Sequence, residues 1–195
     1  MLQFRQRGSG SQNGAYAGLP LAWHTLRYLT TRGGPLASGS SDIGGFIRTR
    51  AELTRPDAQI MMSPYSLDFS AQSMAFEKFP GMQTFGYLLR PESCGSVMAR
   101  SANPDDSPAI QPNYLSTETD RRAVVDMLRW MRRWMAQPAL TQYVGEETTP
   151  GVDVATEEQI LDAFRQRGQA GFHAAGTCRM GTDARAVLDA RLDRP

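Results

Sequence analysis

The stretch from Thr117 to Met135 carries the clearest periodic signal in the chain. Its apolar residues recur every three or four positions, which places them on one face of an α-helix. We interpret this stripe as part of the core rather than as a cofactor-binding face. Thr117 is expected to cap the helix, with Asp120 in the place usually taken by Glu or Gln. The stripe consists of Val124, Leu128, Met131 and Met135, widened by Met127 and Trp134.

Two further helices are predicted, one from its ends and the other from the spacing of its apolar residues. One begins at Thr156, because Thr156 and Gln159 have the spacing of a capping box, and it ends at Gly168. The other covers residues 19–31, where Ala22, Leu26 and Leu29 have helical spacing.

Strands dominate the middle of the chain. They are expected at 43–48, 58–62 and 83–89, with 97–100 returning as the hairpin partner of the last. These strands come before the helices expected at 117–135 and 156–168. The sequence therefore predicts an α+β fold, with a mainly antiparallel sheet and flanking helices. Residues 1–15, which include a polar stretch rich in Gly and Ser, are expected to form a flexible lead-in.

Charge and composition exclude several classes of function. The 195 residues carry 21 basic and 20 acidic side chains, a net charge of +1. The chain therefore lacks the excess of positive charge that is typical of proteins that bind nucleic acid. No apolar run approaches the roughly 18 residues that a membrane span needs. Two cysteines make no disulfide framework, and the N-terminus has no secretory signal, so a cytoplasmic location is expected.

One histidine stands out by its surroundings. His173 lies in a stretch from Gly171 to Gly181 with three glycines in eleven residues, which suggests backbone brought close to a ligand. A histidine there can act as a base near neutral pH, and a structural histidine in a tight turn fits the pattern about equally well. His24 is interpreted as a partly exposed helix residue. No metal site is expected, because His173 and Cys178 lack a second His or Cys pair.

Several motifs in the same order carry a resemblance to a known family. Together they resemble the glucose-methanol-choline (GMC) flavoprotein oxidoreductases, especially the choline-dehydrogenase-like members, over nearly all of the chain beyond about residue 15. The motifs are GGFIR at 44–48, PDAQ at 56–59, RSANP at 100–104, IQPNYL at 110–115, HAAGTCRMG at 173–181 and AVLD at 186–189.

The resemblance implies a function and a set of site residues. Members of this family use FAD to oxidise alcohols: a base takes the hydroxyl proton while a hydride passes to the flavin. His173 matches the family's histidine beside the flavin and is the expected catalytic residue. Gly176 and Thr177 of the same motif are expected to contact the cofactor. Asp42 stands where choline-oxidising relatives place a glutamate near the cationic part of the substrate, and is expected to bind substrate.

The sequence also departs from the family pattern. The FAD-binding fingerprint and the closing segment with the second active-site residue are missing, so residues 16–195 are interpreted as a partial substrate-binding domain. FAD would then be bound mainly by segments outside this chain, in a partner that carries the FAD-binding domain, and the isolated chain is expected to be inactive on its small-molecule alcohol. The alternatives are a non-catalytic binding or assembly module with the same fold, and a product that does not fold stably.

Overall fold

The chain forms two compact units in the computed structural model, which describes residues 1–69, 75–184 and 186–193. The first unit comprises Met1–Arg90 and Arg121–Gly168, and the second comprises Pro91–Asp120 together with the residues from Gln169 onward. Helix α2 (Glu118–Met135) begins in the second unit and continues into the first. The two units together contain the region, 16–195, that the sequence analysis assigns to a partial substrate-binding domain.

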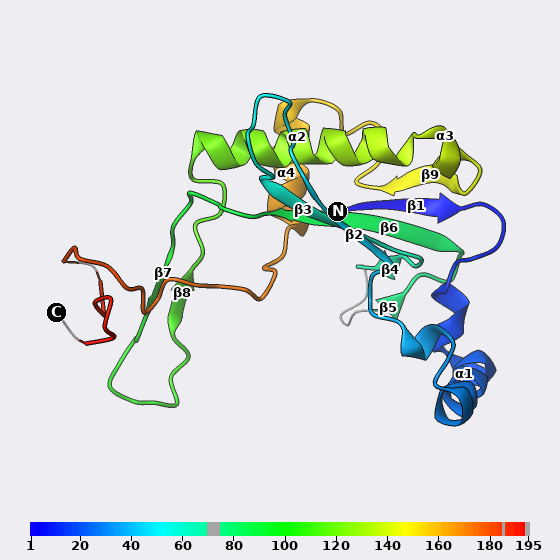
Figure 1. Ribbon diagram of the computed structural model, residues 1–195, viewed down its shortest axis with the longest axis horizontal. Coiled ribbons are helices and arrows are strands. Elements are labelled where there is room, and N and C mark those ends of the chain that lie inside the picture. The colour runs from blue at the N-terminus through cyan, green and yellow to red at the C-terminus, as the bar shows by residue number, and fades with distance from the viewer. Residues whose placement is uncertain (70–74, 185, 194–195) are drawn as a thin grey trace. The chain divides into compact units, whose positions relative to one another are not determined.

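A five-stranded antiparallel sheet is the centre of the first unit (Figure 1). All four strand pairs run antiparallel, and β6 is the middle strand, between β3 and β1. The predicted fold class, α+β with a mainly antiparallel sheet, is confirmed. The strands in spatial order are β2 (Ile43–Ile47), β3 (Ala58–Ser63), β6 (Gly81–Leu88), β1 (Leu2–Gln6) and β9 (Val144–Thr149).

Helix α2 packs its apolar stripe on this sheet, as predicted. A Cβ on Gly86 of β6 would stand 3.0 Å from the sulfur of Met127, and the Thr84 hydroxyl lies 3.6 Å from the sulfur of Met131. Helix α4 (Glu157–Arg167) adds Ile160 and Leu161 to the core. The buried apolar residues of α2 are Ala123, Val124, Val125, Met127, Leu128, Met131 and Met135.

The ends of α4 follow the sequence prediction. Gln159 N donates to the Thr156 hydroxyl, the Gln159 side chain accepts from Thr156 N, and the amide of Gly168 closes the last turn on Phe164 O. The short helix α3 (Pro138–Thr141) follows α2 and leads into β9.

The start of the chain is a strand of the sheet, so the prediction of a flexible lead-in is wrong for these residues. In β1, Leu2 and Phe4 are buried on one face of the sheet. Gln3 points to the other face, where its side chain bonds to both the N–H and the carbonyl of Leu67. Leu2, Gln3, Phe4 and Arg5 alternate apolar and polar as in a strand, but the partner that buries Gln3 lies 64 residues away, so the short segment alone did not reveal the strand.

A smaller set of elements follows and flanks the sheet. The 3₁₀ helix η1 (Asn13–Tyr16) leads into α1 (Gly18–Thr31), and 3₁₀ helix η2 (Pro35–Ala37) precedes β2. Strands β4 (Leu67–Asp68) and β5 (Ala75–Phe76) form a separate antiparallel pair. None of the α1 residues, all of which the structure describes, is buried.

In the second unit, β7 (Ser96–Met98) pairs with β8 (Ala109–Gln111). The predicted hairpin between 83–89 and 97–100 is therefore wrong. The physical reason is that β3 and β1 occupy both edges of β6, so β6 has no edge left for another strand. Among the described residues, no helix is long and apolar enough to cross a membrane.

Candidate functional site

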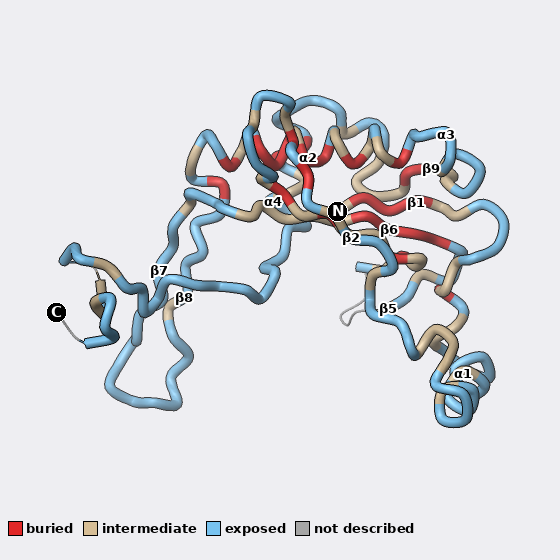
Figure 2. The backbone as a smooth tube through the Cα atoms, viewed as in Figure 1, coloured by how far each residue is buried: buried red, intermediate tan, exposed pale blue. Residues whose placement is uncertain are grey.

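His173 lies in an exposed stretch of the second unit. Figure 2 shows the backbone that follows α4 as exposed, and residues 171–180 are all exposed. Phe172, the preceding residue, has a positive φ of 56° and is 90% exposed. The fold of this stretch comes from backbone contacts further along, since Gly181 N donates to Leu188 O and Val187 N donates to Arg179 O, each over 3.0 Å.

Gly176 and Thr177 are the predicted cofactor contacts, and both are exposed. Gly176 has a φ of +97°, a conformation that favours glycine. Among the described residues, no heavy atom beyond its chain neighbours lies within 4 Å of a Cβ built there. A ligand can therefore approach this backbone without displacing a described side chain.

Asp42 lies in the first unit, immediately before strand β2. Its N–H donates to Met62 O over 3.0 Å, which continues the pairing of β2 with β3 and fixes the backbone there. Two more contacts hold the loop before it: the hydroxyls of Ser41 and Ser63 lie 3.3 Å apart, and the Tyr65 hydroxyl donates to Ser40 O. The Asp42 carboxylate itself is exposed, so it can meet a ligand.

Three aromatic rings that the sequence did not reveal pack together, and the hydroxyl of one of them, Tyr65, donates to Ser40 O, two residues before Asp42. Tyr16 stacks on Phe76 with ring centres 4.8 Å apart, and Tyr65 meets Phe76 edge-on at 5.2 Å. Burial raises the pKa of the Tyr16 hydroxyl, and Tyr65 and the negative charge of Asp42 raise it further. We call Tyr16, Tyr65 and Phe76 the aromatic cluster. Their positions in the sequence have no period, so only the folded chain brings them together.

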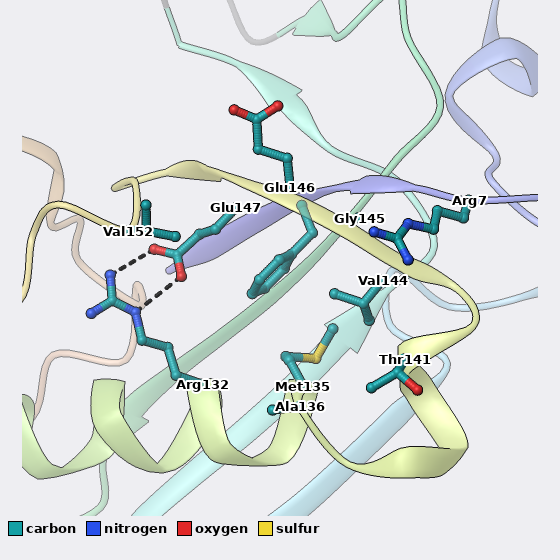
Figure 3. Close-up of a pocket in the computed structure, with 11 residues that line it drawn as sticks. Arg7, Arg132, Met135, Ala136, Thr141, Val144, Gly145, Glu146, Glu147 and Val152 are labelled. Atoms are coloured by element: carbon teal, nitrogen blue, oxygen red, sulfur yellow. Dashed lines mark hydrogen bonds and ion pairs between the residues drawn. The ribbon is translucent and has the colours of Figure 1, made fainter.

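A cavity of about 550 Å³ lies at the other edge of the sheet (Figure 3). Strand β9 forms its rim, whereas Asp42 precedes β2, and these two strands are the opposite edges of the sheet. At one end Arg132 donates two hydrogen bonds to Glu147, of 3.0 and 2.7 Å. Two more bonds from Arg132 go to the carbonyls of Gly151 and Val154. This guanidinium therefore ties α2 to β9 and to the loop after it.

The predicted site residues thus fall in both units. His173, Gly176 and Thr177 share one stretch of the second unit, and Asp42 belongs to the first. His24 lies half-buried in α1. Within the described ranges there is no group of three or more His, Cys, Asp or Glu residues that could hold a metal ion.

Comparison with known proteins assigns the family. The family model described as GMC oxidoreductase matches residues 91–193. The oxygen-dependent choline dehydrogenase of Pseudomonas fluorescens (strain SBW25) is 39% identical over 153 residues, which are 78% of this chain and 27% of that protein. The enzyme of the same name from Escherichia coli O45:K1 is 39% identical over 154 residues, 79% of this chain and 27% of that protein.

Solved structures agree with this assignment at the level of the fold. A formate oxidase superposes on 99% of this chain with a TM-score of 0.84 and 19% identity, which covers 38% of that enzyme. Pyridoxine 4-oxidase from Mesorbium loti superposes on 99% with a TM-score of 0.77 and 20% identity, which covers 33% of it. The chain spans about a quarter of the length of the curated relatives it matches. On the family match over residues 91–193, the chain belongs to the GMC oxidoreductase family.

Proposed function

We propose that this chain is the substrate-binding part of an FAD-dependent oxidoreductase that oxidises a primary alcohol by transfer of a hydride to the flavin. The observation that carries the proposal is the family match, which includes the whole stretch around His173. FAD supplies the redox chemistry in such a reaction when it is bound. The open backbone of Gly176 and the hydroxyl of Thr177 are the groups of this chain that would hold it.

His173 is the residue we assign to the proton transfer. Its imidazole is exposed, so an alcohol can reach it, and histidine exchanges protons near neutral pH. A positioned base of this kind contributes about 10²- to 10⁴-fold to the rate. His173 would accept the hydroxyl proton of the alcohol at a ring nitrogen.

We assign Asp42 to the recognition of a cationic group on the substrate. Its exposed carboxylate attracts positive charge, and the partly exposed rings of the aromatic cluster lie close to it. A cation over such a ring gains about 0.5–1 kcal/mol at an exposed site. The relatives named above are choline dehydrogenases, and choline combines a primary alcohol with a quaternary ammonium group. Choline is therefore the first substrate to test.

We further propose that this chain needs a partner segment that carries the FAD-binding domain and is inactive alone. In support, the matched stretch is only 27% of the relatives' length. The second candidate is a non-catalytic binding or assembly module with this fold. The two candidates differ in whether the fold supports turnover once the rest of the enzyme is supplied.

A chimeric enzyme tests these assignments. This chain replaces the stretch that it matches in the Pseudomonas fluorescens choline dehydrogenase, and flavin content and choline oxidation are measured. We expect bound flavin and turnover. The substitution His173→Ala should lower kcat by about 10²- to 10⁴-fold with unchanged flavin content. The matched control is His24→Ala, the other histidine of the chain, which should leave kcat unchanged.

Each contrary result removes a particular assignment. Unchanged kcat in His173→Ala removes His173 from its role. A chimera that binds flavin but does not oxidise any alcohol favours the binding module. Turnover by the isolated chain with added FAD and an electron acceptor contradicts the need for a partner segment.

A further inference from the structure

Asn13 is a buried amide that makes contacts in three parts of the chain. It is 7% exposed and lies at the start of η1. Its oxygen accepts hydrogen bonds from Ser66 N over 3.1 Å and Gly81 N over 3.2 Å. Its nitrogen donates to Ser66 O over 3.0 Å and to Glu77 O over 2.9 Å. The Ser11 hydroxyl is a further donor, at 3.0 Å. The amide therefore has both its donors and its acceptor in use.

These bonds reach the backbone next to each ring of the aromatic cluster. Tyr16 ends the same turn of 3₁₀ helix that Asn13 begins. Ser66 directly follows Tyr65, and Glu77 directly follows Phe76. One side-chain amide thus joins the three segments that carry the three rings.

The surroundings leave little room for these segments to shift. The Ser66 hydroxyl donates to the Glu77 carboxylate over 2.6 Å, and a Cβ on Gly81 would stand 1.9 Å from the Ser66 Oγ. Arg5 of β1 lies 3.6 Å from the same Glu77 carboxylate, which ties the group to the sheet. Buried polar networks in which every member is bonded hold a single arrangement.

We propose that Asn13 is a positioning residue, whose amide holds the aromatic cluster in place beside Asp42 and thereby sets the affinity of this surface for a cationic group. The statement about the cation rests on the proposed function, whereas the placement of the rings does not. An amide suits the position because it supplies donors and an acceptor at once. Alanine would leave Ser66 N without its side-chain acceptor and Gly81 N with the Ser11 hydroxyl alone. The helix η1, which carries Tyr16, would lose its Asn13 bonds to the segments that carry Tyr65 and Phe76.

The test uses two measurements on the purified chain. The first is ultraviolet titration of the tyrosines, in which Tyr16→Phe identifies the contribution of Tyr16. In Asn13→Ala the pKa of Tyr16 should fall toward its ordinary value, because the ring loses its burial and its place beside Asp42. The second is binding of choline followed by NMR, which should become about five- to tenfold weaker as ring contacts are lost.

The matched control is Gln3→Ala. Gln3 is also a buried amide that bonds to backbone N–H and carbonyl groups, those of Leu67, but none of its described bonds goes to Ser66 or Glu77. It should destabilise the chain to a similar degree and leave both the Tyr16 titration and the binding of choline as in the wild type. Asn13→Leu provides a second variant of similar size, which adds no charge and loses both the donors and the acceptor, and should shift both readouts in the same direction.

The outcomes separate this inference from the proposed function. If Asn13→Ala and Asn13→Leu leave the Tyr16 titration unchanged, Asn13 has no positioning role and the inference is overturned. If the titration shifts and wild-type chain does not bind choline, the placement of the rings by Asn13 stands and the assignment of a cationic ligand is overturned. A chimera without activity that still shows both shifts counts against the proposed function alone.

Discussion

The surroundings of Asp42 and those of His173 are built in different ways. Asp42 precedes a strand of a five-stranded sheet, with hydrogen bonds on its own backbone and on the loop before it, and with the aromatic cluster close by. His173 lies in an exposed stretch whose backbone bonds include those of Gly181 N to Leu188 O and of Val187 N to Arg179 O, and Arg179 forms an ion pair with Asp183. Side chains around Asp42 are therefore fixed by packing, and those around His173 are fixed far less.

This difference has consequences within each unit. A packed region keeps its side-chain rotamers and hydrogen bonds set, because its neighbours fix them. An exposed region with few buried contacts opens locally at a low cost in free energy. Substitutions should therefore cost more in the packed region than in the stretch around His173.

The first prediction, which has the largest expected effect, concerns the packing of strand β1 in the first unit. Leu2 is fully buried in β1, and Leu2→Ala should lower the free energy of unfolding by about 3–4 kcal/mol. The control Leu19→Ala removes the same atoms from a side chain that is 87% exposed, and should change it by less than about 0.5 kcal/mol. Urea denaturation measures both. Equal effects would mean that β1 is not part of the core.

Particular helices and strands show which parts of the fold could be predicted from the sequence and which could not. Helix α2 was predictable, because its apolar stripe repeats with the helical period and is long. The capping box of α4 was predictable because both partners lie within four residues. Strand β1 was missed because it has only five residues and precedes a polar stretch rich in Gly and Ser. The bond that helps to bury Gln3 goes to Leu67, far along the sequence. The pairing of β7 was mistaken because local turn signals do not reveal that β6 already has two neighbours.

The residues of the candidate site were also predictable only in part. Contiguous motifs revealed His173, Gly176 and Thr177, because these residues follow one another in the chain. Asn13 and Tyr16 belong to η1, whereas Tyr65 lies 49 residues after Tyr16 and Phe76 lies in β5. Contacts of that kind are a property of the fold and have no signature in a single sequence.

The second prediction concerns the ion pair at the opposite edge of the sheet from Asp42. The Glu147 side chain is 5% exposed and that of Arg132 is 22% exposed. Breaking a fully buried pair costs about 3–5 kcal/mol, and the partial exposure of Arg132 reduces this, so Arg132→Met should cost about 2 kcal/mol. Arg133→Met, at the exposed neighbouring position, is the control and should be close to neutral. A neutral Arg132→Met would show that the edge with β9 does not depend on this bond network.

The third prediction concerns the buried carboxylate of Asp120 in the second unit. Asp120 is buried, and its carboxylate accepts bonds from Glu92 N over 3.0 Å and Ser93 N over 2.8 Å. Asp120→Asn should cost about 1–2 kcal/mol, because one of these donors then faces an amide N–H₂ group. Hydrogen exchange of the Glu92 and Ser93 amides measures the effect locally. Asp105→Asn, an exposed aspartate of the same unit, is the control.

The same carboxylate predicts a dependence on pH. Burial alone would raise the pKa of Asp120, but hydrogen bonds from Ser93, Glu92 and Thr117 together lower it below its ordinary value. A depressed pKa in the folded state stabilises the fold above the ordinary value of about 3.9. That contribution is lost as the pH falls through the lower, folded-state pKa. Protection of the Glu92 and Ser93 amides should therefore fall below about pH 4 in the wild type and change less in Asp120→Asn. Identical profiles would contradict this.

The smallest effect is expected in the stretch around His173. Arg179 and Asp183 form an ion pair of 2.5 Å, and both side chains are well exposed. Water screens such a pair, so Arg179→Gln should leave the melting temperature of the chain unchanged. Exchange of the Gly181 and Val187 amides should speed up slightly, since their bonds hold the turn that the pair spans. A loss of melting temperature comparable to that of Leu2→Ala would show that this stretch is as firmly packed as the sheet. The contrast between Asp42 and His173 would then have to be abandoned.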